Sequence, residues 1–100
     1  MEVHILASGS DGNCAVIRHE DRAIMVDAGL SAKRIISLMN LNGLDPKEIE
    51  CILITHEHSD HISGLKTLLK HYDFPVYAPR TGGNRLLGML PELDTRLVTV

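Results

Sequence analysis

Four side chains that bind metal ions well lie within six residues of this chain: His56, His58, Asp60 and His61. They directly follow the apolar run 51–54, which is typical of a buried strand. Imidazoles and a carboxylate are the ligands that a hydrolytic zinc site requires. The pattern H-x-H-x-D-H at the end of an apolar run therefore predicts a strand over residues 51–55 that leads into a metal-binding loop.

The spacing within this motif predicts two metal ions. Residues i and i+2 of an extended segment point to the same side, so His56 and His58 are expected to bind one ion together. Asp60 and His61 fall where the chain must turn, so their side chains can diverge and hold a second ion nearby. Two neighbouring ions can share a bridging hydroxide and stabilise both the attacking and the leaving oxygen. The alternative is a polar surface loop whose histidines bind nickel or zinc fortuitously.

Length and charge limit the class of protein. One hundred residues allow a single small domain. The net charge is −3 and the longest basic run is Lys33-Arg34, which is not the pattern of a typical nucleic-acid binder. A nucleic-acid substrate stays open, because bound divalent ions would supply positive charge where a phosphate sits.

The two cysteines and the N-terminus indicate a cytoplasmic protein. Cys14 and Cys51 are too few for a disulfide framework and lack C-x-x-C spacing, so both are expected to be small buried residues. Glu2 and His4 interrupt the start of the chain, which therefore does not resemble a signal peptide. No apolar run approaches the length of a membrane span, so no membrane association is expected.

Hydrophobic periodicity predicts a mixed α/β protein. Strands are predicted at residues 3–7, 14–18, 23–27, 51–55, 76–78 and 97–100. Helices are predicted from the cap Ser31 to Asn42, from Pro46 to about residue 50, after the metal loop as far as Phe74, and over 85–90. The continuous apolar run 51–55 favours a strand buried on both faces. The element order predicts a mixed sheet with helices on one face.

The chain resembles the metallo-β-lactamase fold superfamily. The resemblance rests on residues 52–65, ILITHEHSDHISGL, and on residues 25–29, MVDAG. The opening ASGSDGNC at 7–14, together with DAGLS at 27–31, is similar to the bacterial WalJ-type (YycJ-like) subgroup, whose members are regarded as DNA exonucleases. The resemblance implies an αββα sandwich, of which residues 1–100 would be the N-terminal half of a single domain.

The resemblance also implies roles for the motif residues. His56 and His58 would bind one metal, and Asp60 and His61 would bind the other. Asp60 would in addition act in catalysis by orienting the attacking hydroxide.

Three residues before the motif match family positions outside the ligand set. Asp27 would support the metal loop by hydrogen bonding to a ligating imidazole, a role with clear physical sense for a carboxylate; the alternative is a simple turn residue before Ala28-Gly29. Ser10 and Asn13 either line the substrate cleft or, as we favour, form a structural hairpin turn. Asp11-Gly12 can equally serve as the tight turn itself.

Part of the family's ligand set has no match in these 100 residues. The family supplies a third histidine, a bridging aspartate and a final histidine from beyond residue 100, and the remaining histidines here do not replace them. The missing ligands are expected from a C-terminal half of a longer protein. The alternatives are a natural truncation and a partner copy of the same chain.

The function predicted from these observations is metal-dependent hydrolysis by a metal-bound hydroxide, most simply as a phosphodiesterase or DNA exonuclease. One alternative is a small-molecule hydrolase that cleaves a lactone, thioester or lactam, because the motif is common to all of these. A di-iron oxygen or nitric oxide reductase and a non-catalytic fragment are further alternatives. Two divalent ions are expected as cofactors, with zinc as the default and manganese or iron as alternatives.

Overall fold

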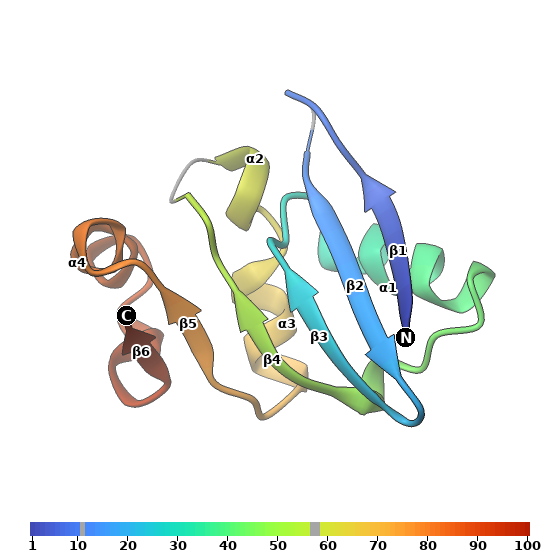
Figure 1. The fold of residues 1–100 in the computed structure, drawn as a ribbon. Helices are drawn as coiled ribbons and strands as arrows, with labels where there is room; N and C mark the ends of the chain where they lie inside the picture. The colour runs from blue at the N-terminus through green and yellow to red at the C-terminus, as the bar shows by residue number, and fades with distance from the viewer. Residues whose placement is uncertain (11, 57–58) are drawn as a thin grey trace.

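The computed structural model describes residues 1–10, 12–56 and 59–100. In these residues, neighbouring strands pair in the order β1-β2-β3-β4-β5-β6 to form one sheet (Figure 1). The strands are β1 Glu2–Ala7, β2 Cys14–His19, β3 Arg22–Val26, β4 Ile49–Leu53, β5 Val76–Ala78 and β6 Leu97–Thr99. The first three strands are antiparallel, whereas β4, β5 and β6 each run parallel to the strand before them. The predicted mixed sheet is confirmed.

Helical connections join the parallel strands, as parallel pairing requires. They are α1 Ala32–Leu41, the 3-10 helix η1 Pro46–Glu48, α2 Ser59–Ile62, α3 Leu65–His71, α4 Arg80–Met89 and the 3-10 helix η2 Pro91–Thr95. Figure 1 shows α1 and α3 behind the sheet and α4 beside β5 and β6. The predicted cap is confirmed, because the Ser31 hydroxyl accepts a hydrogen bond from the Arg34 amide.

The core lies between the sheet and the helices. Val16, Met25, Ile52 and Val76 project from four adjacent strands and are fully buried. The same cluster includes Ile35 and Met39 of α1, Leu65 and Leu68 of α3, and Leu86 of α4. The predicted arrangement, with helices on one face of the sheet, is therefore confirmed.

The prediction that β4 is buried on both faces is wrong for the described structure. Ile52 and Ile54 are buried, but the alternate residue Leu53 is 36% exposed and Cys51 is half-buried. Side chains alternate between the two faces of a strand, and the described helices cover only the face of Ile52. An apolar run shows that the side chains on both faces of a strand are apolar. It does not show whether other structure covers both faces.

The helix predicted after the metal loop is divided at Gly64 into α2 and α3. The Gly64 amide donates to the Ala28 carbonyl (2.8 Å), and a Cβ at Gly64 would collide with the Leu30 carbonyl oxygen. Only glycine permits so close a backbone approach. This contact ties the metal loop to the segment after β3.

The helix predicted at 85–90 begins earlier, at Arg80. It includes Gly82 and Gly83, which lower helix propensity and so hide the start of the helix from periodicity. A Cβ at Gly83 would lie 2.6 Å from Thr99 Cγ2, so glycine allows α4 to pack closely on β6.

Among the described residues, no helix combines the length and the apolar character needed to cross a bilayer.

The two cysteines are expected to differ in reactivity. Burial, and secondarily the Asp27 carboxylate, raises the pKa of the Cys14 thiol to about 12. Burial, and secondarily Glu50, also raises the pKa of Cys51, but this residue is only half-buried. Thiolate is the reactive form, so iodoacetamide at pH 8 should modify Cys14 at least about ten times more slowly than Cys51. Site-resolved mass spectrometry measures both rates, and urea should remove the difference. Equal rates in the folded protein would contradict the buried position of Cys14.

Candidate metal centre

The predicted metal loop lies at the carboxyl end of β4, where β3 also ends (Figure 1). The carboxyl ends of parallel strands meet at this edge of the sheet, which is the usual location for ligand sites in sheets of this kind. The loop leads directly into α2, and α2 leads to Gly64. The site is therefore built from the segments that follow β3 and β4, two strands that pair with each other in the sheet.

The structure brings together two of the four predicted ligands. The imidazole rings of His56 and His61 have centroids 5.0 Å apart and are inclined by 46°. His58 lies outside the described residues, as does the side chain of Asp60, whose backbone belongs to α2. Within residues 1–10, 12–56 and 59–100, no group of three or more His, Cys, Asp or Glu side chains is placed to hold a metal ion. The full ligand set therefore stays a prediction.

Asp27 is the buried charged residue of the described core and lies beside this pair of imidazoles. Its side chain is 7% exposed, and its Oδ2 accepts a hydrogen bond from His61 Nδ1 (2.8 Å). Its Oδ1 accepts from the Thr55 amide (2.8 Å), and Oδ2 also accepts from the Thr55 hydroxyl (2.7 Å). The contact between carboxylate and imidazole is the one that the predicted supporting role requires.

The backbone at Asp27 has an unusual conformation. Its φ of +62° lies in the left-handed region, which aspartate tolerates better than most residues. The Asp27 amide continues the β3–β4 ladder by donating to the Leu53 carbonyl (2.7 Å), and the Ala28 amide donates to the His61 carbonyl (2.7 Å). The left-handed turn thus places the carboxylate against Thr55 while the next residue holds the end of α2.

Thr55 is a residue of the site that sequence reasoning did not single out. Besides its two bonds to Asp27, its Oγ1 lies 3.1 Å from His56 Nδ1 and 3.4 Å from His61 Nδ1. The available signal was its position directly before the first histidine of the motif.

The turn before β2 supports the site from the other side of β3. The Asn13 amide group donates to the Gly9 carbonyl (2.8 Å), and Asn13 Oδ1 accepts from the Gly9 amide (3.1 Å). The Asn13 carbonyl accepts from the Gly29 amide (2.8 Å), which links this turn to the segment after Asp27. These bonds favour the structural interpretation of Asn13; Asp11 lies outside the described residues.

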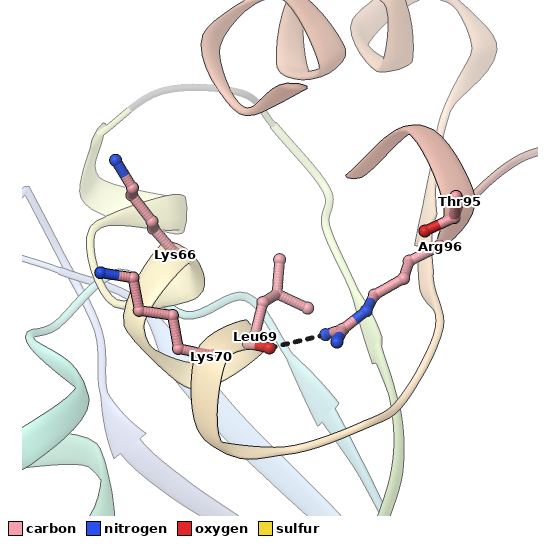
Figure 2. A pocket seen from close by; sticks show the side chains of 5 residues that line it. All are labelled: Lys66, Leu69, Lys70, Thr95 and Arg96. Atoms are coloured by element: carbon pink, nitrogen blue, oxygen red, sulfur yellow. Dashed lines mark hydrogen bonds between the residues drawn. The ribbon is translucent and has the colours of Figure 1, made fainter. Parts of the chain in front are cut away.

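A separate hollow lies between α3 and the end of η2, lined by Lys66, Leu69, Lys70, Thr95 and Arg96 (Figure 2). Arg96 Nη1 donates to the carbonyls of Leu69 (2.8 Å) and Tyr72 (3.1 Å), so its guanidinium satisfies the end of α3. The amino groups of Lys66 and Lys70 point away from Arg96 in Figure 2. The three cationic groups do not converge, and we assign no site to this hollow.

The residues present at the metal loop fit a divalent metal ion by their chemistry. Imidazole suits zinc and iron, and the carboxylate of the motif also suits manganese. A ligating histidine normally donates its other ring N–H to a carboxylate or a similar group, and His61 makes a hydrogen bond of this kind to Asp27.

Comparison with known proteins agrees with this geometry. Residues 7–93 match the family model described as the metallo-beta-lactamase superfamily. The chain is 43% identical over 91 residues to exodeoxyribonuclease YycJ of Bacillus anthracis, covering 91% of this chain and 34% of that protein. It is 47% identical over 74 residues to exodeoxyribonuclease WalJ of Streptococcus pneumoniae, covering 74% of this chain and 28% of that protein.

A solved structure supports the same fold. A B3 metallo-beta-lactamase with an active-site glutamic acid is 26% identical, with a TM-score of 0.74, over 91% of this chain and 40% of that one. The chain thus spans about a third of the length of the curated relatives it matches. By sequence, by sheet and by motif, the chain belongs to the metallo-beta-lactamase superfamily.

Proposed function

We propose that this chain carries part of the active site of a metal-dependent hydrolase that degrades DNA from its ends. The observation that carries the hydrolase is the buried Asp27 carboxylate bonded to His61 inside the H-x-H-x-D-H motif. The exonuclease is supported by the similarity to two exodeoxyribonucleases at 43% and 47% identity. The cytoplasm, where DNA is present in bacteria, is the proposed location.

The motif residues have distinct proposed roles. His56 and His58 hold one divalent ion, and Asp60 and His61 hold the other. Asp60 also orients the attacking water, while Asp27 keeps the His61 ring in place. Bound ions would supply positive charge for the phosphate and activate water as the nucleophile. Zinc is the proposed metal, with manganese or iron as alternatives that the donor set also accepts.

We further propose that residues 1–100 form the N-terminal half of one domain, whose remaining ligands come from a following segment. The face of the sheet that the described helices leave uncovered supports this proposal. Val3 and Ile5 are 63% and 65% exposed there, and Leu53 and Val98 of other strands are also exposed. An apolar sheet face of this kind is normally covered by another layer of structure.

Metal analysis of the isolated chain tests this division. Zinc prefers four ligands, so a chain that holds only part of the set should retain less than one zinc ion after dialysis against metal-free buffer. Elemental analysis counts the metal, and light scattering measures the mass of the particle. Nearly two ions per chain in a dimer would contradict the proposal and show instead that a partner copy completes the site.

A small-molecule hydrolase is the second candidate, favoured by the likeness to a B3 metallo-beta-lactamase. The two candidates are separated by assaying the native polypeptide that contains residues 1–100, loaded with zinc or manganese. Progressive shortening of end-labelled DNA supports the exonuclease. Hydrolysis of a chromogenic lactam or a thioester without any shortening of DNA would overturn it.

A further inference from the structure

The Thr55 hydroxyl lies between a buried carboxylate and the first histidine of the motif. Its Oγ1 is 2.7 Å from Asp27 Oδ2 and 3.1 Å from His56 Nδ1. Thr55 belongs to neither the predicted ligands nor the residues given a role above. Its hydroxyl nevertheless lies within hydrogen-bond distance of both Asp27 and His56.

The polarity of these bonds follows from the chemistry of the groups. An ionised carboxylate only accepts hydrogen bonds, so the single hydroxyl proton of Thr55 is donated to Asp27 Oδ2. Thr55 Oγ1 can then only accept from His56, so the proton of the neutral His56 ring is on Nδ1. The lone pair that binds a metal is therefore on Nε2.

His61 is oriented by the same carboxylate oxygen. Its Nδ1 is 2.8 Å from Asp27 Oδ2 and 3.4 Å from Thr55 Oγ1, so the carboxylate is the nearer acceptor. Asp27 Oδ2 thus accepts one bond directly from an imidazole and one from the hydroxyl that serves the other imidazole. The two rings lie close together, with centroids 5.0 Å apart and planes inclined by 46°.

We propose that Thr55 is a positioning residue that fixes the tautomer and the orientation of His56 for metal binding through Nε2. Through Thr55, the buried Asp27 carboxylate controls both imidazoles rather than His61 alone. This inference rests on the proposed function in one respect, since it takes His56 as a metal ligand. The arrangement of donors and acceptors in the metal-free protein is independent of that assumption.

Two substitutions separate the hydroxyl from the rest of the residue. Thr55→Val keeps the β-branched shape and the backbone amide that bonds Asp27 Oδ1, but removes the hydroxyl. Thr55→Ser keeps the hydroxyl and removes the methyl group. Thr55 is exposed, so both variants should fold, and Thr55→Ala provides a second hydroxyl-free variant if the valine does not.

The first measurement is nitrogen-15 NMR of the histidine rings in the metal-free chain. The wild type and Thr55→Ser should show His56 protonated at Nδ1, whereas Thr55→Val should show a mixture of both tautomers. An unchanged tautomer in Thr55→Val and Thr55→Ala would overturn the inference. Equal disturbance by the serine and valine variants would also overturn it, because the methyl group would then be responsible.

The second measurement is a zinc titration followed on the same resonances. Loss of a partner that orients a ligating histidine typically weakens metal binding about 10–100-fold, so Thr55→Val should require correspondingly more zinc than Thr55→Ser. Equal zinc affinity of the two variants would overturn the positioning role. If His56 and His61 do not respond to zinc even in the native polypeptide that contains residues 1–100, the proposed function fails, whereas the tautomer result tests Thr55 separately.

Discussion

Replacing Asp60 with asparagine is expected to slow DNA hydrolysis about 10³-fold, within the range that a residue acting on the nucleophile typically contributes. Asp60 is proposed both to bind the second ion and to orient water, and an amide lacks the negative charge for either task. His58→Ala should cause a comparable loss, because it removes a ligand of the first ion. The rate is measured under single-turnover conditions on end-labelled DNA, with the native polypeptide and saturating zinc or manganese.

Matched controls exist for both substitutions. Asp73→Asn removes the same charge from a side chain that is 99% exposed and lies beyond α3. His19→Ala removes a histidine that is 71% exposed at the end of β2. Both controls should retain full activity, and all four variants should keep the circular dichroism spectrum of the wild type. Full activity in Asp60→Asn or in His58→Ala would overturn the assignment of the site.

Asp27→Asn is expected to lower the free energy of unfolding by about 2–4 kcal/mol, because buried donors lose their acceptor. The asparagine oxygen can still accept from the Thr55 amide. Its NH₂ group would then face the Thr55 hydroxyl and His61 Nδ1–H, which both donate to the carboxylate in the wild type. Asparagine also tolerates the left-handed φ of +62°, so this variant tests the charge without adding backbone strain. Urea unfolding of the metal-free chain measures the effect.

The same variant should also weaken zinc binding by about 10–100-fold, since it removes the group that orients His61. Asp27→Ala should be less stable than Asp27→Asn, because alanine accommodates a positive φ poorly. Asp73→Asn again provides the control, with a change of less than about 0.5 kcal/mol expected for an exposed position. A stability of Asp27→Asn equal to that of Asp73→Asn would contradict the hydrogen-bond network described at the metal loop.

Local signals in the sequence were sufficient to predict most of the elements. The Ser31 cap and Asn42 delimit α1, and the short strand β5 was predicted with its observed bounds. These features depend on neighbouring residues, which a sequence displays directly. The early start of α4 cannot be predicted from local sequence, because Gly83 lowers helix propensity. The reason for a glycine at this position is its close contact with Thr99, a residue that is distant in the chain. Non-local packing outweighed helix propensity at this position.

The candidate site shows the same division between local and distant information. The motif His56 to His61 is visible as a pattern, and Asp27 was assigned a supporting role through family resemblance. The role of Thr55 depends on the pairing of β3 with β4, which brings it to a carboxylate 28 residues earlier in the chain. No property of residue 55 alone reports that contact.

The order of strands in the sheet has a consequence for how the chain acquires its structure during synthesis. From β2 to β6, each strand pairs with the strand that precedes it in the sequence. Each strand from β2 onward therefore finds a partner that has already been synthesised, so the sheet can grow in the direction of translation. The short connections between β1 and β2 and between β2 and β3 also favour rapid folding of the antiparallel part. The buried carboxylate and the histidines beside it can therefore be assembled on a nascent polypeptide while synthesis continues.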